Sequence, residues 1–122
     1  MNKLPIEFEE LFLEAKGLIE SEDSPQQVIA VQTVKGHTYS FANNIMHGEL
    51  TEEKNFIDRL VQEDDTEINC LVCMWNTQEL DIPSQHLRKL LIEINPLNQE
   101  MMLLLKGADG YILKKLNVIK PL

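Results

Sequence analysis

Two ionisable residues at positions 47 and 49 have types and a spacing that could serve chemistry. His47-Gly48-Glu49 comes directly before an amphipathic stretch, so both side chains would lie at the start of a helix. Histidine and glutamate in such a place can act in catalysis. They also have a structural interpretation, in which Glu49 complements the helix dipole and His47 is a plain loop residue. Both interpretations stay open from these residues alone.

The two cysteines and the other two histidines are weaker candidates for chemistry. Cys70 and Cys73 have the spacing of a C-x-x-C motif, but they fall in a predicted strand. Residues three apart in a strand face opposite sides and lie about 10 Å apart, which is too far for a disulfide or a shared metal. We therefore predict buried structural thiols. His37 is expected to face solvent in a hairpin turn, and His86 to be a partly exposed helix residue.

Length and composition predict one soluble domain, residues 1–122. Apolar residues make up 43% of the chain and charged residues 25%, which is ordinary for a globular protein. No apolar run is long enough for a membrane span, and the first residues lack a secretory signal pattern. Two cysteines fit a reducing compartment. We expect a cytoplasmic protein that does not enter a membrane.

The charge is concentrated in the first half of the chain. Residues 1–65 hold 14 acidic and 5 basic side chains, whereas residues 66–122 hold six of each. Such an acidic chain would repel a polyphosphate backbone, and it has no basic stripe interleaved with aromatic residues. Nucleic acid is therefore not an expected partner, although a free nucleoside or base is not excluded.

Hydrophobic periodicity predicts the elements that would position these residues. Residues 8–19 form an amphipathic helix, followed by a strand over 28–34 and a returning hairpin strand over 38–41. The next helix covers roughly 48–63, with Phe56, Ile57, Leu60 and Val61 on its buried side.

The second half continues the alternation of strands and helices. We expect a strand over 68–75, a helix from Pro83 to Asn95, and strands over 101–105 and 111–113. The order α-β-β-α-β-α-β-β predicts an α/β fold, a three-layer α-β-α sandwich around a mixed five-stranded sheet. Connections through helices suggest a mostly parallel central portion with an initial hairpin.

This order, together with two short motifs, resembles the cytidine deaminase-like superfamily across nearly the whole chain. His47-Gly48-Glu49 follows the hairpin, where that family has H/C-x-E. Pro83-Ser84-Gln85-His86-Leu87-Arg88 follows the third strand, where the family has P-C-x-x-C. Residues 87–93 are similar to the C-R-x-x-x-x-E stretch of the small cytidine deaminases.

The resemblance implies a zinc site whose ligands are largely missing here. By the family's pattern, zinc would be held by His47 and by residues 84 and 87, and Glu49 would be the proton shuttle. The chain has Ser84 and Leu87 at those positions; a serine hydroxyl is a poor zinc ligand, and leucine is none. His86 lies between them but is expected to point away from their shared face. No cofactor is predicted, and family-type deamination is expected to be lost.

Two classes of function follow. In the first, the chain is a pseudo-deaminase that binds a protein partner or a small ligand in a vestigial cleft lined by His47, Glu49, Trp75, Ser84 and Leu87. Trp75 could line that cleft or fill the space of the missing metal. The alternative is a divergent metal-dependent hydrolase or deaminase that uses His47 and Glu49, and only this reading requires zinc. The resemblance also implies a possible homo-oligomer, for which the apolar residues near the C-terminus could supply a contact.

Overall fold

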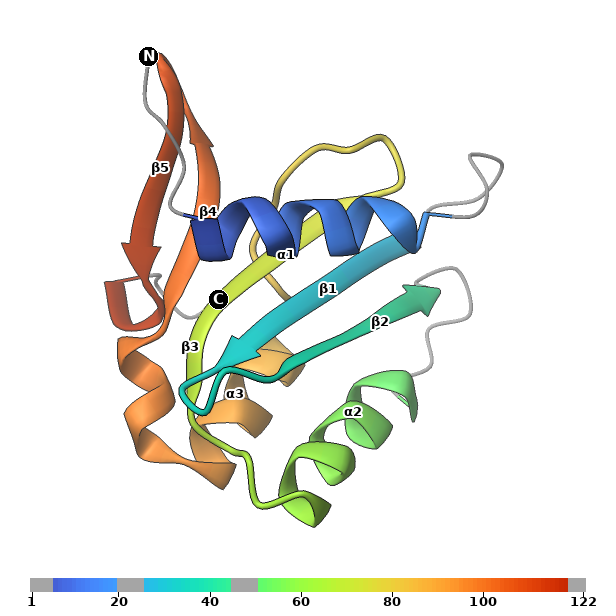
Figure 1. Cartoon of the computed structure of the whole chain (residues 1–122), viewed down its shortest axis with the longest axis vertical. Coiled ribbons are helices and arrows are strands. Elements are labelled where there is room, and N and C mark those ends of the chain that lie inside the picture. Colours follow the sequence, from blue (N-terminus) through green and yellow to red (C-terminus); the bar gives the residue numbers. More distant parts are fainter. Residues whose placement is uncertain (1–5, 20–25, 45–50, 119–122) are drawn as a thin grey trace.

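The helices and strands follow the expected order along the chain (Figure 1). The computed structural model describes residues 6–19, 26–44 and 51–118. The elements are α1 (Ile6–Gly17), β1 (Gln26–Thr33), β2 (Thr38–Asn44), α2 (Thr51–Gln62), β3 (Ile68–Trp75), α3 (Gln85–Ile94), β4 (Met102–Gly107) and β5 (Gly110–Lys115). Two short 3-10 helices, η2 (Pro96–Glu100) and η3 (Leu116–Val118), flank the last two strands. Among these helices, none has the length and apolar character required to cross a bilayer.

The sheet is mixed, in the strand order β2-β1-β3-β4-β5. β1 pairs antiparallel with both β2 and β3, β3 pairs parallel with β4, and β4 pairs antiparallel with β5. The expectation of a mostly parallel central portion is therefore wrong, since β3 and β4 form the one parallel pair in the described sheet. The reason is that α2 connects β2 to β3, and β1 lies between these two strands and runs opposite to both.

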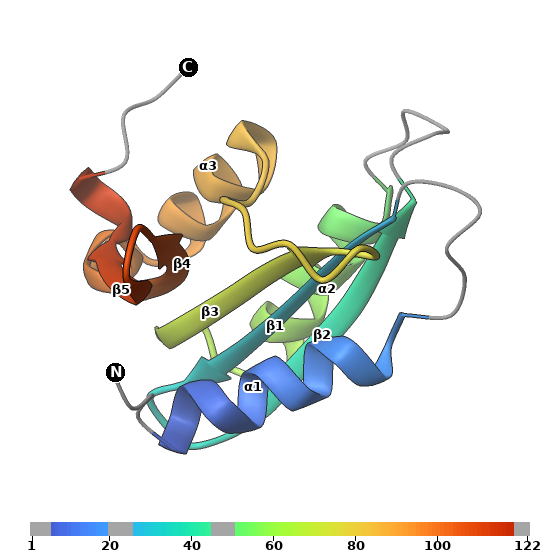
Figure 2. The same ribbon diagram turned by 90° about the horizontal axis from the view of Figure 1, so that it is seen from above.

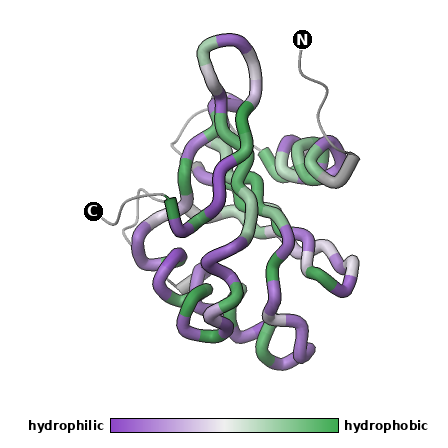
Figure 3. Tube along the Cα trace, turned by 90° about the vertical axis from the view of Figure 1, so that its left-hand side faces the viewer, coloured by the Kyte–Doolittle hydropathy of each residue, from purple (hydrophilic) through white to green (hydrophobic). Residues whose placement is uncertain are grey.

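Helices cover both faces of the sheet, which confirms the three-layer α/β sandwich (Figure 2). α1 packs on β1 and β3 from one side, and α2 and α3 lie on the other side. Because β1 and β3 are covered on both faces, their sequences are continuously apolar rather than alternating. Ile29 and Val31 belong to the core under α2 and α3, whereas Val28 and Ala30 belong to the core under α1. Figure 3 shows hydrophobic residues along the central strands.

The buried face of α2 differs from expectation at one position, Val61. Phe56, Ile57 and Leu60 are buried in α2, but Val61 is 51% exposed. The prediction for Val61 is wrong because each residue turns the helix by about 100°, which takes Val61 off the face shared by the other three. In α3, Leu87 and Leu91 are fully buried.

A buried asparagine in η2 joins the C-terminal end of α3 to the start of β3. Asn98 has no exposed surface, and its Oδ1 accepts a 2.7 Å hydrogen bond from the backbone N–H of Ile68. Its Nδ2 donates to the carbonyl oxygens of Leu91 at 2.8 Å and Thr66 at 2.9 Å. One side chain therefore satisfies three backbone groups, two of them buried and one partly buried, and it connects α3 to the sheet.

Candidate functional site

A buried carboxylate in the first turn of α2 is the centre of the polar contacts between α2 and α3. Glu53 has no exposed surface, although it is a charged residue. Its Oε2 accepts a 2.7 Å hydrogen bond from the hydroxyl of Ser84, and its Oε1 lies 2.9 Å from Nδ1 of His86. Because a buried charge is costly unless it is paired and hydrogen-bonded, these contacts account for a glutamate in this position.

Ser84 has a structural task in addition to this contact. It is the N-cap of α3, and its Oγ accepts a 3.0 Å hydrogen bond from the backbone N–H of Leu87. A serine hydroxyl has one proton to donate, and here that proton goes to Glu53. The hydroxyl thus acts as donor and as acceptor between the two helices, and α3 begins after Ser84 rather than at Pro83.

Leu87 lies one turn further along α3 and belongs to the core. It is fully buried, in the cluster that also contains Leu91 and Cys73. The structure therefore places positions 84 and 87 at the beginning of the same helix, but with a capping hydroxyl and an aliphatic side chain. His47 and Glu49, the other two residues expected here, lie outside the described residues.

Sequence reasoning missed the contact between His86 and Glu53. His86 is 40% exposed, as expected for a helix surface, and its ring reaches the carboxylate that Ser84 also contacts. This contact was not expected, because it depends on α2 lying beside α3. Glu53 itself could have been found, because it lies three and four residues before Phe56 and Ile57 on the buried face of α2.

Beneath this cluster, β3 contributes a thiol and an indole. Burial raises the pKa of the Cys73 thiol, and the charges of Asp81 and Glu53 raise this pKa further. Cys73 therefore stays protonated and unreactive at neutral pH. Cys70 is buried in the opposite core, so the prediction of two buried thiols on opposite faces is confirmed. The indole N–H of Trp75, which is partly buried, donates a 2.9 Å hydrogen bond to Asp81.

A small pocket lies beside the first turns of α2, against β2. It has a volume of about 220 Å³ and is lined by Ser40, Phe41, Glu52, Asn55, Phe56 and Arg59. The rings of Phe41 and Phe56 pack with their centroids 4.7 Å apart. Oε2 of Glu52 is buried and has no hydrogen-bond partner among the described residues. The lining thus combines two aromatic rings with polar side chains, which suits a flat ligand.

A second buried carboxylate lies at the far end of α2. Asp65 is 2% exposed, and its Oδ2 lies 2.7 Å from Nδ1 of His37 and accepts a 3.0 Å hydrogen bond from the Tyr39 hydroxyl. Burial alone would raise the pKa of Asp65, but hydrogen bonds from His37, Thr33 and Tyr39 lower it below its ordinary value. His37 is 63% exposed, as expected in a hairpin turn. This network joins the β1–β2 hairpin to the end of α2.

Comparison with known structures identifies the fold. The chain is similar to the cytidine deaminase from Mycobacterium leprae, with a TM-score of 0.71 and 16% identity, over 97% of this chain and 100% of that chain. The cytidine deaminase from Mycobacterium tuberculosis matches with a TM-score of 0.65 and 14% identity, over 93% of this chain and 94% of that one. The cytidine deaminase from Burkholderia pseudomallei matches with a TM-score of 0.66 and 14% identity, over 93% and 95%. The chain thus has the cytidine deaminase-like fold. No protein-family model matches the sequence, and no curated protein matches it.

The described side chains at positions 84 and 87 do not fit the zinc site that the resemblance to cytidine deaminases implies. Leu87 carries no donor atom, and the Ser84 hydroxyl is engaged by Glu53 and by the backbone of α3. Within the ranges that the structure describes, no three His, Cys, Asp or Glu side chains are grouped so that they could hold a metal ion. What the described residues do form is a hydrogen-bonded cluster of Glu53, Ser84 and His86.

Proposed function

We propose that this chain is a non-catalytic protein of the cytidine deaminase-like fold, which binds a protein partner or a small ligand near the start of α2 and α3. The observation that carries the proposal is the chemistry at positions 84 and 87. Leu87 is fully buried in the core, and the hydroxyl of Ser84 is used by Glu53 and by the helix cap. Neither residue can serve as the thiolate ligand that hydrolytic zinc would require there.

Binding near the same place is supported by the pocket between β2 and α2. It offers two packed phenylalanine rings beside the polar side chains of Asn55 and Arg59 and next to Glu52, the neighbour of Glu53 in the sequence. A planar molecule would stack on the rings and meet these polar side chains. His47, Glu49 and Trp75 remain proposed members of the binding region.

Metal analysis of freshly purified protein tests the proposal. We expect no stoichiometric zinc in the wild-type chain, and no ammonia release from cytidine, adenosine or guanine in its presence. The matched variant is His47→Ala, which we expect to leave the metal content unchanged. Near-stoichiometric zinc that is lost in His47→Ala, or turnover of any of the three substrates, would overturn the proposal.

One observation favours a second candidate, a metal-dependent hydrolase or deaminase with a different ligand set. Glu53 and His86 supply a carboxylate and an imidazole 2.9 Å apart at the start of α3. Together with His47 as a third ligand and Glu49 as proton shuttle, the side chains of Glu53 and His86 are of the types that could hold zinc. This candidate requires zinc in the wild-type protein that is lost in both His86→Ala and Glu53→Gln. Retention of all bound zinc in these variants would exclude it.

The proposal also covers the location of the protein and the kinds of partner that it binds. We propose a cytoplasmic, single-domain protein. Its net charge of −9 supports the proposal that it does not bind nucleic acid.

Self-association is supported by apolar side chains at the surface of the C-terminal hairpin and η3, where Ile112 is 39%, Leu113 36% and Val118 61% exposed. Light scattering of Ile112→Asp and the wild type would show whether these residues hold a homo-oligomer together.

A further inference from the structure

A roomier pocket lies on the α1 side of the sheet, and none of the Glu53, Ser84 and His86 cluster lines it. It has a volume of about 410 Å³, which falls within the range of about 300–1,000 Å³ that small-molecule sites have. Its lining comes from three parts of the chain: α1, the segment that follows β3, and the hairpin of β4 and β5. Apolar and charged side chains both contribute to it.

The apolar part of the lining consists of Phe12, Leu80 and Tyr111, which pack against the core under α1. The rings of Phe12 and Tyr111 meet edge to face, with their centroids 6.1 Å apart and their planes at 68°. Nζ of Lys16 lies 5.7 Å from the centroid of the Phe12 ring. Since these contacts hold the rings in place, an apolar ligand could pack on them with little rearrangement.

The segment after β3 is folded back on the end of that strand by backbone hydrogen bonds. The N–H of Trp75 donates a 2.9 Å hydrogen bond to the carbonyl oxygen of Glu79, and the N–H of Gln78 donates a 2.8 Å hydrogen bond to the carbonyl oxygen of Trp75. Leu80 then pairs with Met74 in a single antiparallel bridge. This part of the pocket wall is therefore formed before a ligand arrives.

Two side chains of opposite charge, Glu79 and Lys106, line the same pocket. Both residues are exposed, and among the described residues neither belongs to an ion pair. Lys106 lies directly opposite Tyr111 in the hairpin, and such pairs point to the same face of a sheet. A ligand with one charge would be attracted by one of these side chains and repelled by the other, whereas a ligand with both charges would pair with both.

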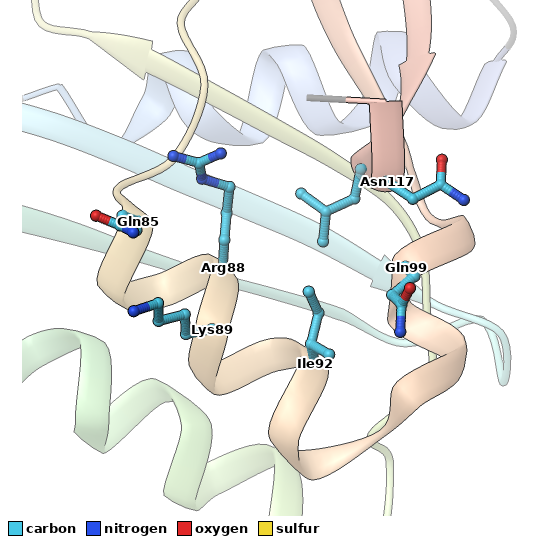
Figure 4. Close-up of a pocket in the computed structure, with 7 residues that line it drawn as sticks. Gln85, Arg88, Lys89, Ile92, Gln99 and Asn117 are labelled. Atoms are coloured by element: carbon cyan, nitrogen blue, oxygen red, sulfur yellow. The ribbon is translucent and has the colours of Figure 1, made fainter. Parts of the chain in front are cut away.

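The pocket along α3, between that helix and the 3-10 helices η2 and η3, differs in this respect (Figure 4). Its cationic side chains, Arg88 and Lys89, point in different directions, and Nε and Nη2 of Arg88 are buried. Those two charges are therefore not presented together to one ligand. The exposed side chains of Glu79 and Lys106 can both turn toward a molecule in the pocket on the α1 side.

We propose that the pocket on the α1 side binds a free α-amino acid with an apolar side chain. Such a molecule carries an ammonium group and a carboxylate on one carbon atom, beside an apolar body. The ammonium group pairs with Glu79, the carboxylate pairs with Lys106, and the side chain packs on Phe12, Leu80 and Tyr111. This site is independent of the function proposed above, because its apolar residues belong to the core under α1 and not to the core under α2 and α3.

Titration of the full chain with L-phenylalanine, followed by two-dimensional amide NMR, tests the site. We expect shifts at residues 12, 77–80, 106 and 111. Three analogues each lack one part of the ligand: phenethylamine has no carboxylate, 3-phenylpropionate has no ammonium group, and glycine has no apolar body. Each is expected to bind more weakly than L-phenylalanine. Equal binding of any one of them, or the absence of shifts at these residues, would overturn the proposal.

Variants of the two charged residues test how the ligand is oriented. Lys106→Gln is expected to weaken the binding of L-phenylalanine and 3-phenylpropionate about fivefold and to leave that of phenethylamine unchanged. Glu79→Gln is expected to weaken the binding of L-phenylalanine and phenethylamine by a similar factor and to leave that of 3-phenylpropionate unchanged.

The matched controls remove the same charges outside the pocket. Lys114→Gln lies on the opposite face of the same hairpin, and Glu10→Gln lies at an exposed position of α1. All four positions are exposed, so we expect every variant to fold. A control that loses as much affinity as its matched variant would overturn the proposal. A variant that weakens L-phenylalanine, phenethylamine and 3-phenylpropionate equally would do the same.

Discussion

The hydroxyl of Ser84 donates a 2.7 Å hydrogen bond to Glu53, a carboxylate with no exposed surface. This contact joins the first turn of α2 to the N-cap of α3, the position at which the resemblance to cytidine deaminases predicts one of the zinc ligands. The two helices are thus connected by a hydrogen bond between their own side chains.

Removal of Glu53 is therefore expected to destabilise the protein strongly. Glu53→Ala leaves the Ser84 hydroxyl and the His86 ring without their acceptor, and we expect a loss of about 2–4 kcal/mol in the free energy of unfolding. Urea denaturation measures this. The control is Glu63→Ala, just after the end of α2, where Oε2 of Glu63 lies 3.6 Å from Nε of Arg59 in an exposed ion pair. It should change stability by less than about 0.5 kcal/mol, and equal losses would contradict the role given to Glu53.

Introducing cysteines at positions 84 and 87 is expected to create zinc affinity. Ser84→Cys with Leu87→Cys places two thiols one turn apart at the start of α3, and we expect the double variant to purify with zinc. Each single variant should contain none, because one thiolate is too few. Elemental analysis measures the metal, and adding His47→Ala to the double variant tests the third ligand.

The double variant also has a stability signature. Without metal it should be less stable than the wild type, because Leu87→Cys removes buried methyl groups and Ser84→Cys removes the cap. Added zinc should raise its melting temperature, since a ligand that binds only the folded state stabilises it. A melting temperature that does not respond to zinc would mean that positions 84 and 87 do not form half of a metal site.

The order of elements could be predicted from sequence, and the direction of the central strands could not. Apolar runs of strand length marked β1 and β3, because both faces of these strands are covered. Nothing local in the sequence indicates that β1 lies between β2 and β3, and this placement makes two of the three pairings among β1, β2, β3 and β4 antiparallel.

The partners of the buried carboxylates could not be predicted from the sequence either. Glu53 meets Ser84 across 31 positions and Asp65 meets His37 across 28, so their partners depend on tertiary packing. The motif H-x-E directed attention to Glu49, which lies outside the described residues, and the position of Glu53 on the buried face of α2 was the signal that could have found Glu53. Ser84 and Leu87 were placed correctly at the start of α3, because the proline and the following apolar period mark a helix start.

Tyr39 is expected to ionise at a higher pH than an ordinary tyrosine. Burial, together with the hydrogen bond to Asp65 and its negative charge, raises the pKa of Tyr39 to about 12. The ordinary pKa is about 10, so the neutral phenol contributes stability that is complete below about pH 10 and is lost as the pH rises toward 12. Absorbance at 295 nm of Tyr111→Phe, in which Tyr39 is the remaining tyrosine, should give a midpoint near 12. Asp65→Asn should lower that midpoint, and a midpoint of about 10 without this change would contradict the burial of the hydroxyl.

Asp65 makes the opposite contribution at acid pH. Its pKa is lowered in the folded protein, so its ionised form stabilises the fold above the ordinary pKa of about 4, and this stability is lost as the pH falls through the folded value. Asp65→Asn should cost about 1–3 kcal/mol at pH 7, and the deficit should shrink at lower pH. The control is Asp64→Asn, an exposed neighbour at φ 51°, a conformation that asparagine accepts. A deficit for Asp65→Asn that does not change with pH would show that the charge of Asp65 plays no part.

Asn98 is expected to be the most sensitive polar position outside the candidate site. Its three hydrogen bonds satisfy the backbone groups of Ile68 and Leu91, which are buried, and of Thr66, which is partly buried. Asn98→Ala removes all three and should cost about 3 kcal/mol or more, with faster amide hydrogen exchange at Ile68. Asn69→Ala is the control, since that side chain is exposed and its hydrogen bond to Gln32 is 3.5 Å long. Asn98→Asp keeps the acceptor for Ile68 but sets a buried charge against two carbonyl oxygens, so it should be at least as unstable as Asn98→Ala at pH 7. An Asp variant as stable as the wild type would mean that the two donor bonds of Asn98 do not hold α3 to the sheet.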